Sequence, residues 1–146
     1  MRRAQHEPIV SANLPRMRTV KDVEAYLFRL NRRFRAVAEQ AGTFVVETGE
    51  GMPPVAVRVE SPLVVLRVHI GDLKKNADPA AVFRRLLELN ARQLVHASYG
   101  LDDDHIVLSS ALELENLDFN ELEATLDEID LALAEHVPLL SDLSKK

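Results

Sequence analysis

The chain has 146 residues, no cysteine and a net charge of -5 at neutral pH. This length suits one domain with a substantial core, and the absence of cysteine excludes disulfide bonds and thiol nucleophiles and is typical of a reducing cytoplasm. The strongest apolar run, residues 63–66, is far shorter than the roughly 20 residues that cross a membrane, and residues 1–14 lack the apolar core of a signal peptide. We therefore expect a soluble, cytoplasmic protein.

The charge is distributed unevenly along the chain. Residues 1–40 carry a net charge of +5 and residues 101–146 carry -11, while the segment between them is close to neutral. Two explanations stay open. Either the first helix lies near the last helix within one chain, or the opposite ends pair between two chains.

The predicted elements begin after an arm. Residues 1–18 combine two prolines with scattered charge and show no sustained period, so we predict a flexible arm there and a single domain over residues 19–146. Thr19 and Asp22 resemble a capping box, which predicts a first helix that ends at Gly42. The apolar residues spaced by three and four along this helix are Val20, Val23, Leu27, Leu30, Phe34, Val37 and Ala41.

Three strands are predicted next, at residues 43–47, 55–60 and 63–70, because apolar and polar residues alternate there. Their short, Gly- and Pro-containing connections indicate antiparallel neighbours. The alternation predicts one packed face and one face that is at least partly exposed.

A second helix is predicted from Asp78 and Pro79, which suit the cap and first position of a helix, to about Leu94. Two further strands at residues 95–101 and 106–114 are expected to form a hairpin around an acidic turn.

The last helix is predicted to start with a capping box of Asp118 and Glu121 and to end or kink near Val137, before Pro138. The complete order is helix, three strands, helix, two strands, helix. It predicts an α+β fold with a five-stranded, mainly antiparallel sheet packed against helices.

No group of residues in the sequence carries recognisable catalytic chemistry. The acidic run 102–104 followed by His105 lacks the ligand spacing of an EF-hand loop, so a solvated hairpin turn is the preferred interpretation. The five histidines are dispersed; His69 and His96 are a pair that can meet across strands, but both lie on the less apolar alternation, where surface histidine is the ordinary outcome. We assign no catalytic residue, metal ligand or cofactor.

Some side chains fall off the predicted core and suit a protein interface. Phe28 projects opposite the first helix's core stripe, on the side of the neighbouring arginines, and Leu63 and Val65 share the exposed alternation of the third strand with Arg67. For Phe28 the ordinary alternatives are a lone exposed ring or a ring packed under the N-terminal arm, and for the arginines a solvated helix face. The candidate protein-interaction surface comprises Phe28, Arg32, Arg35, Leu63, Val65 and Arg67.

A family resemblance adds to this interpretation. The order of elements and short patterns resemble the type III secretion chaperone-like superfamily, and in particular its YbjN-type branch, described as bacterial sensory-transduction regulators. The resemblance covers about residues 19 to 140 and rests on apolar patterns, since none of them is a chemical motif. The patterns are Leu86-Leu87-Glu88-Leu89-Asn90, Tyr99-Gly100-Leu101-Asp102, Ile106-Val107-Leu108 and the segment from Leu117 to Leu133.

The resemblance implies a small, usually homodimeric, non-enzymatic module that binds a protein partner. Leu63 and Val65, or Phe28, are the candidate contacts of the dimer. Family chaperones that escort secreted effectors are typically acidic, whereas this chain has a basic arm and first helix, and this departure leaves effector escort in doubt. Two alternatives are kept: a regulatory module that contacts nucleic acid through the arm and first helix, and an enzyme or small-ligand binder.

Overall fold

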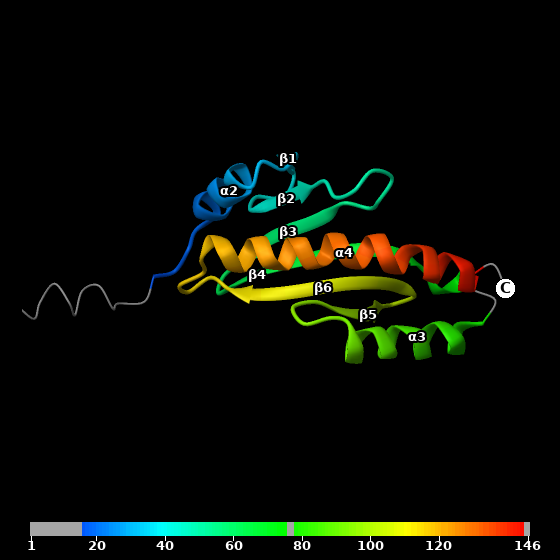
Figure 1. Cartoon of the computed structure of the whole chain (residues 1–146). Coiled ribbons are helices and arrows are strands. Elements are labelled where there is room, and N and C mark those ends of the chain that lie inside the picture. The colour runs from blue at the N-terminus through cyan, green and yellow to red at the C-terminus, as the bar shows by residue number, and fades with distance from the viewer. Residues whose placement is uncertain (1–15, 76–77, 145–146) are drawn as a thin grey trace, which may run out of the picture.

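The computed structural model describes residues 16–75 and 78–144. Six antiparallel strands form one sheet in the order β1-β2-β3-β4-β6-β5 (Figure 1). The strands are β1 (Phe34–Ala36), β2 (Thr43–Val46), β3 (Val55–Glu60), β4 (Leu63–Asp72), β5 (Ser98–Asp102) and β6 (His105–Glu113). The helices are α2 (Val20–Arg29), α3 (Pro79–Arg92) and α4 (Phe119–Ser144), with a short 3-10 helix η2 (Leu73–Lys75). The α+β class and the antiparallel sheet are confirmed.

The predicted helix starts are confirmed by their caps. The Thr19 hydroxyl accepts a hydrogen bond from the Asp22 backbone N–H, and the Asp22 carboxylate accepts from the Thr19 N–H at 2.8 Å. Asp78 accepts from the Ala81 N–H in the same way at the start of α3. Asp118 and Glu121 exchange reciprocal bonds before α4. Each cap satisfies backbone donors that a helix start leaves without partners.

The first helix is much shorter than predicted, and this accounts for the extra strand. Asn31, at φ 59°, leaves the helical conformation directly after the C-cap Leu30. The chain then pairs residues 34–36 with β2, where Phe34 packs edge-on against Phe44 at 6.0 Å between ring centroids. The spacing of Phe34, Val37 and Ala41 therefore suggested a helical stripe where the chain forms a strand and a turn.

Two other boundaries differ from the prediction by more than two residues. β5 begins at Ser98 rather than residue 95, because one carboxylate oxygen of Glu128 on α4 accepts hydrogen bonds from the backbone N–H groups of residues 95–97 at 2.9–3.1 Å and holds them out of the sheet. Helix α4 continues through Pro138 to Ser144. Pro138 cannot donate a backbone hydrogen bond to the preceding turn. The buried side of α4 nevertheless continues to Leu140, so packing against the core extends past the proline. No described helix is long and apolar enough to cross a membrane.

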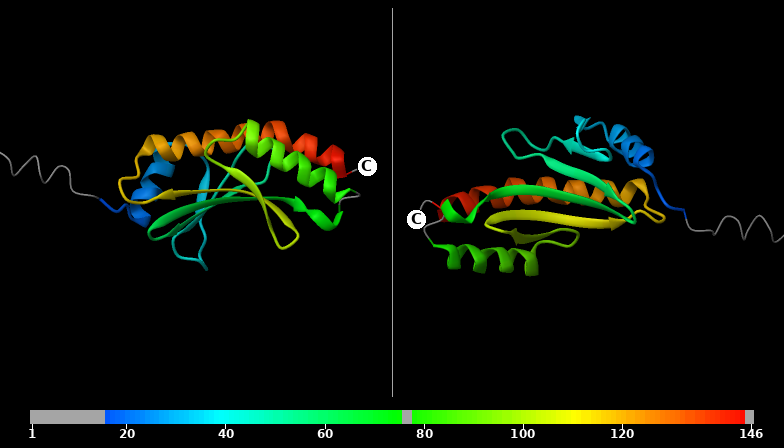
Figure 2. Two further views of the ribbon diagram at one scale, coloured as in Figure 1. Left: turned by 90° about the horizontal axis from the view of Figure 1, so that it is seen from below. Right: turned by 180° about the vertical axis from the view of Figure 1, so that it is seen from behind.

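The two faces of the sheet have different surroundings. Viewed from below, α3 and α4 cover the same side of the strands (Figure 2). The inner face packs with buried residues of the three described α-helices into one core. Its buried strand residues are Phe44, Val46, Val55, Val57, Val64, Leu66, Val68, Ile106 and Leu108, and the buried stripe of α4 includes Leu122, Leu126, Ile129 and Leu133.

Candidate protein-interaction surface

The outer face of the sheet carries the alternate residues of the same strands, and the described helices pack on the other side. The strand register aligns Val45, Ala56, Arg67 and Ser109 across four strands, beside a second row that contains Arg58, Val65 and Ala111. Leu63 lies at the start of β4 and is 36% exposed, and Val65 is half-buried. This outer face therefore offers a continuous, mixed apolar and basic surface.

Ion pairs border the apolar residues of the outer face. Arg67 contacts Asp102 at 3.0 Å and Arg58 contacts Glu60 at 2.9 Å. All four side chains are largely exposed, so each pair contributes little to stability and can exchange its partner at low cost. The arrangement suits recognition of a protein segment that carries both apolar and charged side chains.

The structure separates the six residues of the predicted interaction surface. Leu63, Val65 and Arg67 lie on the outer face of β4, and Arg35 shares that face because it pairs with Val45 on β2. Phe28 lies on α2 and is 79% exposed. Its exposure agrees with the predicted projection away from the core, but its helix packs on the inner face of the sheet.

Arg32 makes intramolecular contacts. Its Nη2 donates to Asp127 Oδ1 at 3.0 Å and to Asp130 Oδ2 at 2.7 Å, both on α4, and its side chain is 15% exposed. Burial alone would lower the pKa of Arg32, but the hydrogen bond to Asp130 and the two acidic charges raise it. Arg29 lies over the Phe119 ring at 4.0 Å, which also joins the basic N-terminal segment to the acidic α4. These contacts favour the explanation of the charge gradient within one chain.

The basic stretch does not form one surface for phosphate groups. Arg29 and Arg32 are directed to α4, whereas Arg33 lies 3.9 Å from Glu47 and Arg35 is on the outer face of the sheet. A phosphate-binding surface needs several cations on one side. Within the described residues this stretch is divided among three directions.

Helix α3 carries an apolar surface that the sequence analysis missed. Its buried side is formed by Val82, Leu86 and Leu89, but apolar residues also line the opposite side. Leu87 is 67% exposed and Phe83 is 37% exposed. Their spacing places them on one side of the helix with two exposed alanines, and this α3 stripe comprises Ala80, Phe83, Leu87 and Ala91. The signal was present in the sequence, because a helix with apolar residues on both sides needs a partner on both sides.

A buried polar network joins α3, β5 and α4. The Tyr99 hydroxyl lies 2.7 Å from His136 Nδ1, and His136 Nε2 lies 2.9 Å from Gln93 Oε1. Because an amide oxygen only accepts, Nε2 carries the hydrogen and Nδ1 accepts from the tyrosine. Burial lowers the pKa of His136 and raises the pKa of Tyr99, so both groups are neutral near pH 7. Both ring nitrogens of His136 contact other residues of the network, which suits a structural role.

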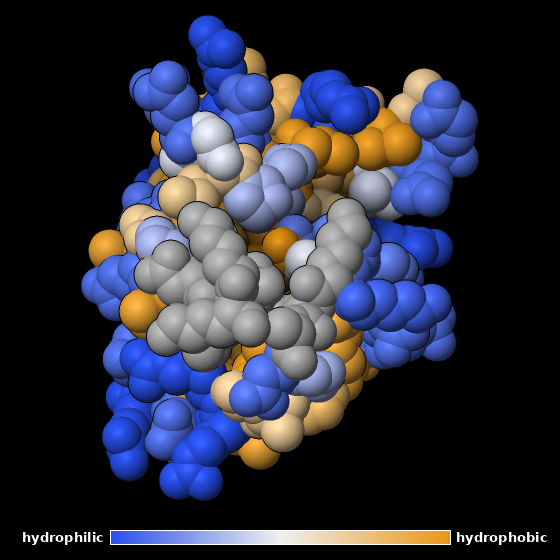
Figure 3. Space-filling view, turned by 90° about the vertical axis from the view of Figure 1, so that its right-hand side faces the viewer, coloured by the Kyte–Doolittle hydropathy of each residue, from blue (hydrophilic) through white to orange (hydrophobic). Residues whose placement is uncertain are grey.

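A groove of 820 Å³ lies beside β1 and the β2–β3 loop. Its lining includes Arg33 and Arg35 as well as Glu47 and Glu50, so the charges balance and favour neither an anionic nor a cationic ligand. The end of the molecule that includes this loop shows hydrophobic residues in several separate places among hydrophilic ones (Figure 3). The groove therefore gives no indication of a catalytic site.

This architecture is similar to that of several solved structures. A chain in the heterodimeric complex ExoU-SpcU from the type III secretion system of Pseudomonas aeruginosa has 17% sequence identity and a TM-score of 0.63, and the match covers 80% of this chain and 96% of that one. YbjN, a putative transcription regulator from E. coli, has 14% identity and a TM-score of 0.56, with coverage of 82% and 91%. Comparison with curated protein sequences returned no match.

A third similar structure contains the Yersinia pestis type III secretion chaperone SycH in complex with a stable fragment of YscM2. The matched chain has 18% identity and a TM-score of 0.53, and the match covers 79% of this chain and 99% of that one. These likenesses confirm the chaperone-like fold that the sequence resemblance predicted. The CesT_Tir_1 family model matches residues 16–146, which include every described strand and helix, and the chain therefore belongs to the CesT_Tir_1 family.

Proposed function

We propose that this protein is a cytoplasmic, homodimeric module that acts by binding another protein and not by catalysis. Membership of the CesT_Tir_1 family supports this role, as does the presence of a second protein in the ExoU-SpcU and SycH-YscM2 structures. The absence of cysteine suits the reducing cytoplasm.

The outer face of the sheet is the proposed partner site, and the observation that carries the proposal is that the described helices all pack on the opposite side of the sheet. Val65 on the inner strand β4 and Leu63 at the start of that strand provide apolar contact, while Arg67 and Arg35 provide charge. An interface with an apolar centre and a polar rim is typical of specific protein association. Arg32 is not included, because its side chain is only 15% exposed and is held by Asp127 and Asp130 of α4.

The α3 stripe is the proposed dimer contact. A two-fold axis beside α3 brings Phe83 and Leu87 of one chain against the same residues of the other, so a single self-complementary stripe is sufficient. Phe28 is less suitable because Glu24, one helical turn before it on α2, is charged and the helix ends directly after it at Arg29. This assignment leaves the outer face free for the partner.

The partner site is tested by affinity capture from the native cell with three matched baits: wild type, Val65→Asp and Phe28→Asp. Both substitutions place a charge at an apolar position that is not fully buried, so both variants should fold. We expect a partner to be recovered with wild type and Phe28→Asp and lost with Val65→Asp. Loss with Phe28→Asp alone would contradict the outer face as the site and favour α2.

The dimer is tested by sedimentation of wild type, Leu87→Asp and Phe28→Asp. Wild type and Phe28→Asp should sediment as dimers, and Leu87→Asp should sediment as a folded monomer. High salt should have little effect, because the proposed contact is apolar. A wild type that stays monomeric at high micromolar concentration would reject the dimer, and a dimeric Leu87→Asp would reject the α3 stripe.

A further inference from the structure

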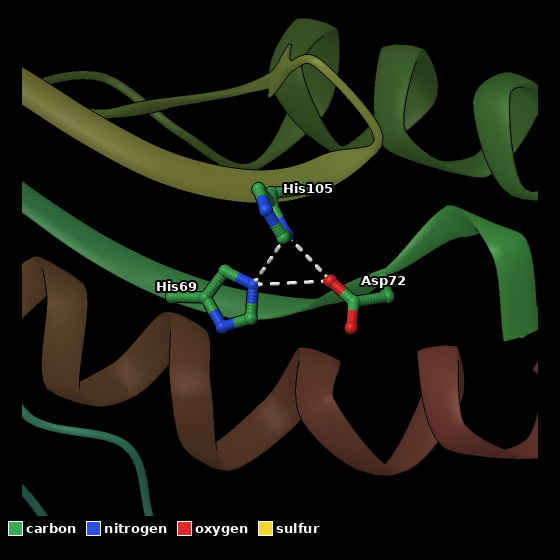
Figure 4. A group of neighbouring side chains, drawn as sticks. All are labelled: His69, Asp72 and His105. Atoms are coloured by element: carbon green, nitrogen blue, oxygen red, sulfur yellow. Dashed lines mark hydrogen bonds and ion pairs between the residues drawn. The ribbon is translucent and has the colours of Figure 1, made fainter.

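Three side chains with metal-binding atoms converge at one end of the outer face (Figure 4). His69 and Asp72 come from β4 and His105 from the start of β6. His69 Nε2 lies 3.1 Å from His105 Nδ1 and 3.4 Å from Asp72 Oδ1, and His105 Nδ1 lies 2.5 Å from the same Asp72 oxygen. All three side chains are accessible to solvent.

The sequence builds this cluster through a bulge and a long-range strand pair. In a regular strand, residues 69 and 72 point to opposite faces, because their separation is odd. The register between β4 and β6 shifts between His69 and Gly71, so that His69 pairs with Val107 and Asp72 pairs with His105. The shift turns Asp72 to the face that His69 occupies, which is how bulges commonly redirect side chains beside functional sites.

The distances fit a small tetrahedral cation. With metal–ligand bonds of about 2.0–2.1 Å, neighbouring ligand atoms of a tetrahedral zinc site are about 3.3–3.4 Å apart. The separations of His69 Nε2 from the other two atoms are 3.1 and 3.4 Å. His69 and His105 are therefore slightly closer than the tetrahedral edge. His105 Nδ1 and Asp72 Oδ1, at 2.5 Å, need to separate by less than about 1 Å to match it.

Cation chemistry also follows from the atom types. When both imidazoles carry their hydrogens on the other ring nitrogen, all three converging atoms offer lone pairs, and a central cation can contact all three at once. Two imidazole nitrogens with one carboxylate oxygen suit a borderline divalent ion such as Zn²⁺, and not Ca²⁺ or Mg²⁺, which prefer oxygen ligands. The acidic turn at residues 102–104, directly before His105, adds negative potential, although Asp102 and Asp104 also contact Arg67 and Lys74.

We propose that His69, Asp72 and His105 form a surface site for a zinc-class divalent cation, with water in the fourth position. The sequence analysis assigned no metal ligand and considered His69 together with His96, whereas His105 is the histidine that β-sheet pairing brings to His69. The site does not depend on the proposed protein-binding role, because it is defined by three ligand atoms of one chain.

The experiment is a calorimetric titration of chelator-treated, untagged full-length chain with zinc chloride. Wild type should bind one equivalent. His69→Ala, Asp72→Asn and His105→Ala should each weaken binding at least tenfold, since even the loss of an outer-shell partner costs 10–100-fold. His96→Ala is the matched control, because it removes an exposed histidine outside the cluster and should bind zinc as wild type does.

Three further measurements make the result decisive. The double variant His69→Ala/His105→Ala keeps His6, His96 and His136, so undiminished zinc binding by this variant would overturn the proposal. Absence of zinc binding by wild type at millimolar zinc would overturn it as well, as would displacement of the zinc by equimolar Ca²⁺. Circular dichroism in the presence of chelator should give the same folded spectrum for every variant, which excludes unfolding as the cause of lost binding.

Discussion

The two faces of the sheet consist of alternate residues of the same strands, yet they differ in solvent exposure and in their contacts with the helices. On β4, Val64, Leu66 and Val68 are inaccessible to solvent, whereas Leu63, Val65 and Arg67 are not. The described helices α2, α3 and α4 pack on the inner side. A substitution on β4 should therefore affect stability if the residue lies on the inner face and binding if it lies on the outer face.

The largest effect is expected for a charge in the inner core. Leu126→Asp places a carboxylate on the fully buried stripe of α4, where the described residues around it are apolar. The penalty of several kcal/mol for a buried unpaired charge is comparable with the whole stability of a small domain, about 5–15 kcal/mol. Circular dichroism should show an unfolded chain. Leu131→Asp is the control on the same helix; Leu131 is exposed, so this variant should stay folded.

A smaller effect separates two adjacent residues of β4. Leu66→Ala removes buried methyl groups from the inner face and should lower the free energy of unfolding by about 2–5 kcal/mol. Val65→Ala, one residue earlier on the outer face, should lower it by less than about 1 kcal/mol. Urea denaturation measures both values. Equal losses would mean that the outer face is buried in the folded protein, and would contradict the comparison.

The inner side also contains a group that titrates, His136. Burial lowers its pKa in the folded state below the ordinary value of 6.5. Between the folded pKa and pH 6.5 the unfolded chain therefore binds more protons than the folded protein. The contribution of neutral His136 to stability is fully present above pH 6.5 and is lost as the pH falls through the folded pKa. The slope from one group cannot exceed about 1.4 kcal/mol per pH unit.

Comparison of wild type with His136→Gln measures this contribution. Glutamine keeps hydrogen-bonding atoms near Tyr99 but does not titrate in this range. Urea denaturation between pH 7 and pH 5 should give a steeper loss of stability for wild type than for the variant. Identical slopes would mean that the histidine is already protonated in the folded protein, or is accessible to solvent.

The sequence predicted those parts of the fold that depend on neighbouring residues. Caps such as Thr19 with Asp22, and the alternation along β3 and β4, are local patterns, and the structure has both. The first helix was predicted too long because Phe34 and Val37 continued its spacing by chance. Asn31 was the available signal, since asparagine adopts the left-handed conformation that ends helices more readily than most residues.

The functional surfaces depended on contacts that no local pattern contains. The ion pairs of Arg32 join residues about 95 positions apart, so the sequence could not indicate that this arginine is occupied. The meeting of His69 and His105 requires both the pairing of β4 with β6, across the intervening α3, and the register shift at residues 69–71. The exposed alternation of Leu63 and Val65 was predictable because it needs only the period of a strand.

The smallest effect on stability, and the sharpest test of the comparison, is expected for Arg67→Ala. Arg67 and its ion-pair partner Asp102 are both exposed, so the loss of the pair should change the free energy of unfolding by less than about 1 kcal/mol. The same substitution removes the charge beside Val65 on the proposed partner site, and capture of the partner should fall severalfold. Arg84→Ala is the matched control, since Arg84 is an exposed arginine on α3, away from the outer face. It should leave both stability and capture unchanged.

If Arg67→Ala instead destabilises the fold as much as Leu66→Ala does, the outer face contributes to the core and the division between the two faces fails. If both arginine variants reduce capture equally, charge is acting from a distance and the outer face is not the specific site.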